Sequence, residues 1–204
     1  MSYCDACAIC GSIKTSKVYV NNNASLCRYG FISSHSESLS VPKDLEICIS
    51  ECKECNFAWN TKFKSSKVNY SDLPVLEASL HSPAYLEFQR CQATWLSEKL
   101  NLSDKALLEI GGGSGYFISH SNAKKKIVFE PSNECKNISD DIIIHNKYFN
   151  PNLDFIDADV VVMRQVLEHI HNPFVFLQSL IENSNRSDGF IYLEVPSYDQ
   201  SRLN

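Results

Sequence analysis

The sequence predicts an α/β fold in which a small cysteine-rich module precedes a Rossmann-like, doubly wound parallel sheet. Three observations carry this prediction: two Cys-x2-Cys pairs stand in the first 55 residues, five short apolar runs follow residue 105, and a glycine-rich turn comes directly after the first run. At 204 residues, the chain can form one well-buried domain and a small second one.

A helix and five strands account for most of the chain after residue 82. Ser82 and Pro83 suit an N-cap and a first helical position, and apolar side chains at helical spacing extend this helix over residues 83–100. Continuous apolar runs are typical of parallel strands buried on both faces, and Pro173–Asn183 is the clearest connecting helix. The predicted strands are Ala106–Ile110, Ile127–Glu130, Ile142–His145, Val160–Met163 and Phe190–Val195.

The charge and hydropathy of the chain limit the kinds of partner that it is expected to bind. A net charge of −5 and a pI near 5.7 argue against nucleic acid, because that binding depends on Lys and Arg side chains. No stretch is apolar for long enough to span a bilayer, and the first residues lack the order of a signal peptide. We therefore expect a cytoplasmic protein with no nucleic-acid or membrane partner.

The two Cys-x2-Cys pairs predict a structural zinc site with the ligands Cys7, Cys10, Cys52 and Cys55. Each pair can occupy two corners of a tetrahedron, and the cytosol keeps thiols reduced, which favours a metal over disulfides. Gly11 and Asn56, which follow the pairs, tolerate the left-handed backbone of tight turns. Cys4 and Cys7 form an alternative first pair, although Gly11 favours Cys7 with Cys10.

A glycine-rich turn joins the first predicted strand to a helix start. Gly111, Gly113 and Gly115 form a GxGxG pattern, in which the backbone can approach a ligand closely. A dinucleotide fingerprint needs glycine or alanine where Tyr116 stands, which disfavours a nicotinamide dehydrogenase. Glu130 ends the second strand, where a carboxylate can accept hydrogen bonds from both hydroxyl groups of a ribose.

Four segments of the chain resemble motifs of a known family. Residues 108–117 (LEIGGGSGYF) and 129–132 (FEPS) resemble the first two motifs of class I S-adenosylmethionine-dependent methyltransferases. Residues 159–170 (DVVVMRQVLEHI) and 192–196 (YLEVP) are similar to segments of one subgroup, which also carries an N-terminal four-cysteine zinc module. This subgroup includes C-methyltransferases that act on nucleotide-linked deoxysugars, and the resemblance covers nearly the whole chain.

The resemblance implies an enzyme that methylates a nucleotide-linked sugar or a related small molecule, in surface-polysaccharide or secondary metabolism. The clustering of cysteines and the change of pattern along the chain divide it into an expected zinc-binding module (1–62), a helical linker (63–104) and a partial S-adenosylmethionine-binding domain (105–204). The helix start after Gly115 suits the methionine carboxylate of the cofactor. The implied cofactor-binding residues are Glu109, Gly111, Gly113, Gly115, Glu130 and Arg164.

Members of the subgroup continue beyond their fifth strand. The chain is therefore expected to be either a fragment of a longer enzyme or a shortened, catalytically silent scaffold that needs a partner chain. A sheet that ends at its fifth strand exposes an apolar edge, so self-association is expected unless another chain covers that edge.

His169 is the predicted general base or substrate anchor. It follows the fourth strand, at the carboxyl end of the sheet where open α/β folds bind their ligands. The spacing Gln165-x3-His169 predicts that both side chains share one helical face, and similar sugar methyltransferases use an amide and a histidine there. His171 is the rival, but beside Pro173 it is expected to lie in a solvated turn.

Overall fold

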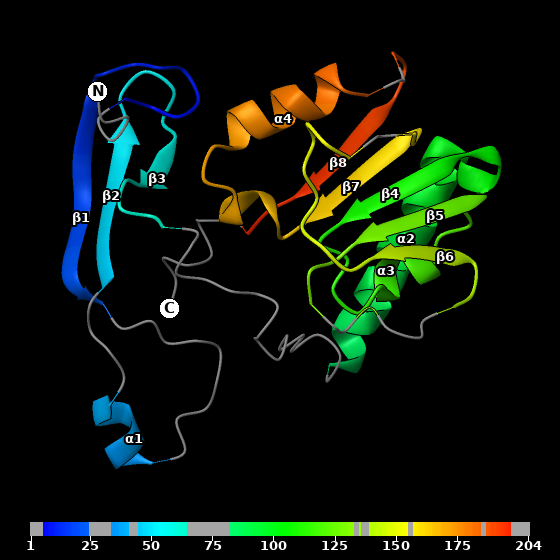
Figure 1. The fold of residues 1–204 in the computed structure, drawn as a ribbon, viewed down its shortest axis with the longest axis horizontal. Coiled ribbons are helices and arrows are strands. Elements are labelled where there is room, and N and C mark those ends of the chain that lie inside the picture. The colour runs from blue at the N-terminus through cyan, green and yellow to red at the C-terminus, as the bar shows by residue number, and fades with distance from the viewer. Residues whose placement is uncertain are drawn as a thin grey trace. The chain divides into compact units, whose positions relative to one another are not determined.

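The computed structural model describes most of the chain and divides it into two compact units. One unit comprises Met1–Val68 and His171–Phe174, and the other comprises Asn69–Ile170 and Val175–Asn204 (Figure 1). The described residues are 6–24, 34–40, 45–64, 82–132, 135, 139–154, 157–184 and 187–196.

The first unit is built on a three-stranded antiparallel sheet. Its strands β1 (Thr15–Ala24), β2 (Leu45–Cys52) and β3 (Ala58–Asn60) pair in the order β1-β2-β3, and a short helix α1 (His35–Ser40) lies between the first two in sequence. The cysteine pairs lie at two tight turns, one before β1 and one between β2 and β3.

Helix α2 (Pro83–Leu100) opens the described part of the second unit, as the Ser82-Pro83 signal predicts. The Ser82 hydroxyl accepts a hydrogen bond from the Tyr85 amide at 3.4 Å, and Pro83 takes the first helical position, where a missing N–H costs nothing. The left-handed Asn101 ends the helix, and a 3-10 turn, η4 (Leu102–Asp104), leads into the sheet.

A five-stranded parallel sheet forms the centre of this unit. The strand order is β6-β5-β4-β7-β8, and the α/β class and parallel sheet that the sequence predicts are confirmed. Two of these strands, β4 and β7, are buried along their entire length. Apolar and polar residues therefore do not alternate in their sequences. The strands are β4 (Ala106–Ile110), β5 (Lys125–Phe129), β6 (Ile142–His145), β7 (Val160–Arg164) and β8 (Phe190–Glu194).

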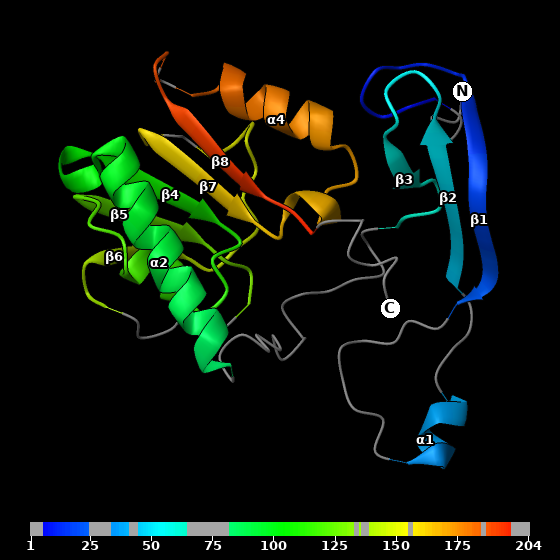
Figure 2. The ribbon, with the colours of Figure 1, turned by 180° about the vertical axis from the view of Figure 1, so that it is seen from behind.

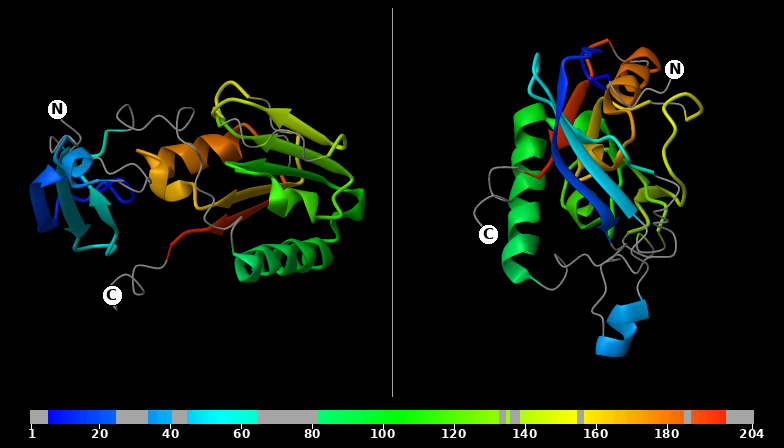
Figure 3. Two further views of the ribbon diagram at one scale, coloured as in Figure 1. Left: turned by 90° about the horizontal axis from the view of Figure 1, so that it is seen from below. Right: turned by 90° about the vertical axis from the view of Figure 1, so that its left-hand side faces the viewer.

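Helices cover both faces of the parallel sheet. Successive strand residues point to opposite faces, so Leu107 and Val162 pack with α2 and the short α3 (Tyr116–Ser119), whereas Leu108 and Met163 pack with α4 (Pro173–Glu182). Figures 2 and 3 show α2 and α4 on opposite sides of the strands. Burial of each such side chain contributes about 1.5–3 kcal/mol to folding.

Strand β8 lies at one edge of the parallel sheet. Apolar side chains along it remain in solvent, with Phe190 50% and Leu193 40% exposed. An apolar edge of this kind is what the sequence predicts for the fifth strand. None of the helices in the described ranges combines the length and apolar character needed to cross a bilayer.

Candidate functional site

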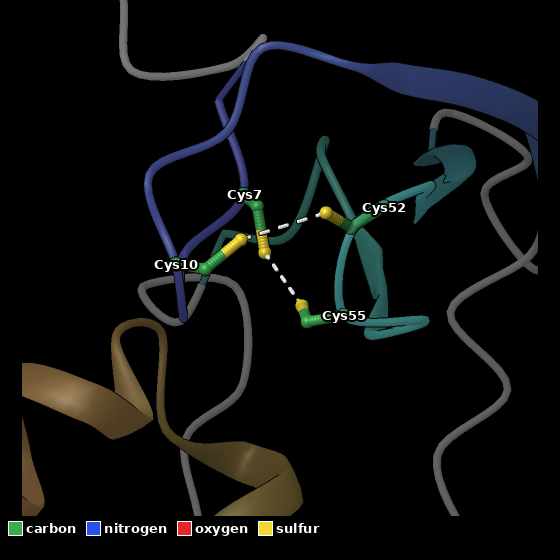
Figure 4. Close-up of side chains that lie close together, drawn as sticks. All are labelled: Cys7, Cys10, Cys52 and Cys55. Carbon is green, nitrogen blue, oxygen red and sulfur yellow. Dashed lines mark hydrogen bonds between the residues drawn. The ribbon is translucent and has the colours of Figure 1, made fainter.

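The four predicted zinc ligands converge in the first unit (Figure 4). The sulfur atoms of Cys7, Cys10, Cys52 and Cys55 all lie within 4.8 Å of one another. The Cys7–Cys55 and Cys10–Cys52 sulfur pairs are each 3.6 Å apart, too far for a disulfide. Four sulfurs bonded to one zinc at about 2.3 Å stand about 3.8 Å apart, so the cluster matches a tetrahedral site.

Backbone geometry brings the two cysteine pairs together. Gly11 and Asn56 adopt positive φ angles of 71° and 60°, which gives each pair the left-handed turn that its sequence predicts. Backbone amides donate to two of the sulfurs, from Ile9 to Cys7 and from Glu54 to Cys52, each at 3.4 Å. Such donors stabilise sulfur as the thiolate that a metal requires.

The thiols of the cluster shift the pKa values of their neighbours in opposite directions. Backbone hydrogen bonds, above all at Cys55, lower the pKa of Cys52 to about 7. A backbone hydrogen bond at Phe57 favours the Cys55 thiolate, but burial and the neighbouring sulfurs outweigh it and raise the pKa of Cys55 to about 12. A divalent cation is the natural counter-charge for four adjacent thiolates. The predicted alternative ligand Cys4 lies outside the described residues.

A separate candidate site lies in the second unit, at the glycine loop (Gly111–Gly115) that follows β4. Gly111, Gly113 and Gly115 have φ angles of 71°, 53° and 73°. A Cβ atom on Gly111 would come within 2.4 Å of the Val166 side chain, and one on Gly112 within 2.7 Å of Val128. The loop therefore requires glycine, and it leaves backbone where a ligand can approach closely.

The glycine loop lies where the sheet changes its winding direction. Strand β4 has β5 on one side and β7 on the other, so the chain runs outward in both directions from this strand. Open parallel sheets bind ligands beyond the carboxyl ends of the strands at this point. Contact between Gly111 and Val166, which follows β7, joins the loop after β4 to the loop after β7.

Glu130 reaches the glycine loop from the end of β5. Its Oε2 accepts a hydrogen bond from the Gly113 amide at 2.9 Å, and its Oε1 accepts one from the Ser132 amide at 2.8 Å. The side chain is 6% exposed. A carboxylate offers about four lone-pair positions, so both oxygens retain the capacity to accept a ribose hydroxyl.

Glu109 and Arg164 form a buried ion pair near the same loop. Nη1 of Arg164 lies 4.0 Å from Oε1 of Glu109, and the two side chains are 7% and 2% exposed. Oε2 of Glu109 lies 3.5 Å from the position that a Cβ atom on Gly112 would take. The guanidinium of Arg164 also stacks on Phe117 at 4.4 Å. Glu109 therefore places one carboxylate oxygen beside the loop, and Arg164 neutralises the charge of that carboxylate from its other oxygen.

The predicted helical pairing of Gln165 with His169 is wrong. Gln165 follows β7 with a φ of 54°, a left-handed conformation that cannot continue into an α-helix. Only a 3-10 turn, η5 (Leu167–His169), comes after it. Both side chains are exposed beyond the end of β7, and the spacing of four residues does not place them on one helical face. His171 is exposed in a bend, as predicted.

Three further polar residues, Gln89, Gln92 and Glu194, surround Arg164 beside the glycine loop and were not predicted as site residues. Gln89 accepts a hydrogen bond from Arg164 at 3.0 Å, and Gln92 donates one to Glu194 at 2.7 Å. Both glutamines lie on the face of α2 that packs on the sheet, three residues apart. Their one sequence signal is this spacing, which places polar side chains among the apolar positions of the helix.

Comparison with known proteins places this arrangement in a family. A family model described as a methyltransferase domain matches residues 85–204. That match includes all but the first two residues of α2, the glycine loop, Glu130 and the end of β7. No protein of curated function matches the chain in sequence.

Several solved structures are similar to part of the chain. Magnesium protoporphyrin IX methyltransferase from Synechocystis PCC 6803, with bound S-adenosylhomocysteine, is 14% identical, with a TM-score of 0.40 over 50% of this chain and 52% of its own. The plantazolicin methyltransferase BpumL, in complex with a pentazolic desmethylPZN analog and S-adenosylhomocysteine, is 12% identical, with a TM-score of 0.44 over 62% of this chain and 59% of its own. An S-adenosylmethionine-dependent methyltransferase from Thermotoga maritima is 23% identical, with a TM-score of 0.38 over 52% and 53%.

The chain thus spans between half and three-fifths of the length of these three proteins. The family model itself covers more than half of the 204 residues. On that match, and in agreement with the motifs in its sequence, the chain belongs to the class I S-adenosylmethionine-dependent methyltransferase domain family.

Proposed function

We propose that the chain binds S-adenosylmethionine at the glycine loop and transfers its methyl group to a small molecule. The observation that carries this proposal is the hydrogen bond between the Gly113 amide and Oε2 of Glu130, which joins a left-handed glycine backbone to a buried carboxylate. Backbone without side chains suits the methionine part of the cofactor, and the carboxylate suits its ribose. The acidic side chain of Glu109 suits its ammonium group.

A titration separates methyl transfer from the other chemistry that this fold supports. We expect calorimetry to detect S-adenosylhomocysteine binding to the purified chain and no binding of NAD, because Tyr116 stands where a dinucleotide fingerprint needs a small residue. Binding of NAD with no binding of S-adenosylhomocysteine would reverse the assignment.

The cofactor, when bound, supplies a methyl group on a sulfonium. The chain's own task is to orient the acceptor, exclude water and remove a proton where the acceptor has one to lose. His169 lies beyond the carboxyl end of β7, on the side of the sheet where open parallel sheets bind their ligands, and an imidazole there can accept a proton or a hydrogen bond. We assign it the role of general base or substrate anchor, with Gln165 as a neighbouring polar contact.

Replacing His169 by alanine is expected to lower the rate of methyl transfer by about tenfold to a thousandfold and to leave the affinity for S-adenosylhomocysteine unchanged. The matched control is His171→Ala, which removes another exposed imidazole two residues further on. The measurement is methyl transfer to a panel of nucleotide-linked sugars, beside calorimetry. Full activity in His169→Ala, or equal losses in both variants, would remove His169 from the reaction.

The proposed acceptor is a nucleotide-linked sugar or a related small molecule. Support comes from the resemblance of residues 159–170 and 192–196 to sugar C-methyltransferases, and from an N-terminal four-cysteine cluster of the kind that those enzymes carry. We propose that this cluster holds structural zinc, because four sulfurs fill a tetrahedron and leave no open position for a substrate.

The second candidate is a cofactor-binding scaffold that needs a partner chain. The exposed apolar side chains of β8 favour it, since a second polypeptide at that edge would bury them. Self-association of the isolated chain is expected for the same reason. We further propose a cytoplasmic location and no nucleic-acid partner, on the strength of the net charge of −5 and the reduced cysteine cluster.

A further inference from the structure

We propose that Glu194, at the end of β8, is a positioning residue that holds the glycine loop in its binding conformation. The inference rests on the proposed function in one respect, which is that the loop receives the cofactor. Strand β8 lies two strands away from β4, so Glu194 does not border the loop directly. Two series of contacts connect them.

The first series runs through the backbone after β7. Gln165 donates hydrogen bonds to Glu194 from its backbone amide, to the carbonyl oxygen at 2.8 Å, and from its side chain, to Oε1 at 3.2 Å. Gln165 has a φ of 54°, and a residue with a side chain holds such a conformation only when its surroundings enforce it. The two hydrogen bonds to Glu194 hold Gln165 in this conformation.

The left-handed turn at Gln165 sets the position of the next residue. Val166 lies directly against Gly111, where a Cβ atom would come within 2.4 Å of its Cγ2 atom. A change in the Gln165 backbone would therefore move Val166 and remove the wall against which Gly111 packs. By this route, the side chain of Glu194 fixes the first residue of the loop.

The second series runs through buried charges. Oε2 of Glu194 accepts hydrogen bonds from Gln92 at 2.7 Å and from Nε of Arg164 at 3.4 Å. On its other side, Arg164 pairs with Glu109, whose Oε2 lies beside Gly112. Arg164 thus stands between two carboxylates, and Glu194 determines where the guanidinium lies relative to Glu109.

Glu194 is suited to this role because it is ionised and held at both oxygens. Burial alone would raise the pKa of Glu194, but hydrogen bonds from Gln92 and Gln165 and the charge of Arg164 outweigh burial and lower the pKa. Each oxygen serves one series of contacts, Oε1 toward Gln165 and Oε2 toward Arg164. Loss of the carboxylate would therefore loosen the loop at Gly111 and at Gly112 together.

Four variants test the proposal. Glu194→Ala removes the side-chain contacts of both series and leaves only the hydrogen bond from the Gln165 amide to the backbone carbonyl of residue 194. Glu194→Gln retains an amide oxygen for Gln165 but removes the charge that faces Arg164. Gln165→Gly in the Glu194→Ala background restores the left-handed turn without Glu194, because glycine adopts positive φ without strain. Glu182→Ala is the matched control, since Glu182 forms a similar glutamine–glutamate contact with Gln178, at 2.8 Å, on the exposed face of α4.

Two measurements are made on the full chain. Hydrogen exchange reports the opening of residues 111–117 without any ligand, with the β6 segment 142–145 as internal reference, and calorimetry reports the affinity for S-adenosylhomocysteine. We expect Glu194→Ala to accelerate exchange of the loop and to weaken affinity, each by about tenfold, with Glu194→Gln intermediate. The double variant, Gln165→Gly with Glu194→Ala, should recover roughly half of the loss that Glu194→Ala causes in the logarithm of each quantity. It does so because it restores one of the two series.

The proposal is overturned if Glu194→Ala lowers the unfolding temperature while loop exchange and affinity match those of Glu182→Ala. It is also overturned if Gln165→Gly, in the Glu194→Ala background, recovers neither loop protection nor affinity. A wild type that binds no S-adenosylhomocysteine would refute the proposed function, whereas faster loop exchange in Glu194→Ala would still establish the role of Glu194.

Discussion

Removal of zinc is expected to unfold the three-stranded module and to leave the parallel sheet folded. Among the described residues, the buried apolar side chains of the module are Cys7, Ala24, Cys48 and Cys52, so two of the four belong to the metal cluster itself. Larger apolar side chains, such as Ile13, remain in solvent. A structural zinc contributes about 10–16 kcal/mol to the folding of such modules, far more than this core can supply.

The two tryptophans of the chain report the two units separately. Trp59 lies on β3 and stacks on Phe57 at 5.8 Å, whereas Trp95 lies on α2. In a Trp95→Phe background, fluorescence therefore follows the module alone. Chelation, or Cys52→Ser, should abolish the Trp59 signal of the folded state and leave the α-helical circular dichroism almost unchanged.

Cys91→Ser provides the matched control for this experiment, because Cys91 is an exposed thiol on α2, outside the cluster. It should keep the zinc content of the wild type, measured by elemental analysis. The assignment fails if purified wild-type protein carries no zinc, or if Cys52→Ser unfolds at the same temperature and denaturant concentration as Cys91→Ser.

The sequence predicted the elements whose stability comes from local or repetitive signals. Ser82 and Pro83 mark the start of α2 because capping depends on neighbouring residues only. Ala106–Ile110 was predicted with the correct bounds because a strand that is buried on both faces is apolar throughout. The same holds for the glycine loop, since left-handed backbone selects glycine at each such position.

The prediction failed where a conformation depends on distant contacts. Gln165 was assigned to a helix from its spacing to His169, but its left-handed backbone is held by Glu194, which is 29 residues away in sequence. The contacts of Arg164 with Gln89 and of Gln92 with Glu194 span 75 and 102 residues. Polar networks of this kind form only after the strands and α2 have packed, so no local pattern encodes them.

Replacing Glu130 by alanine is expected to weaken binding of S-adenosylhomocysteine by about tenfold to a hundredfold, which corresponds to about 1.5–3 kcal/mol. Two losses contribute. The ribose loses a buried carboxylate acceptor, and the Gly113 amide loses the oxygen that now lies 2.9 Å from it, which loosens the loop before any ligand arrives.

Glu130→Gln separates the two losses, because the amide oxygen can still accept from Gly113 while the negative charge is gone. If the loop contact dominates, the glutamine variant should bind almost as well as the wild type. If the ribose contact dominates, its affinity should approach that of Glu130→Ala, since an amide can offer only one acceptor oxygen to the two hydroxyl groups. Calorimetry on the three proteins decides between these cases, provided that their denaturant unfolding curves agree. Unchanged affinity in Glu130→Ala would remove the carboxylate from the site and leave the glycine loop as the one cofactor contact that the backbone geometry supports.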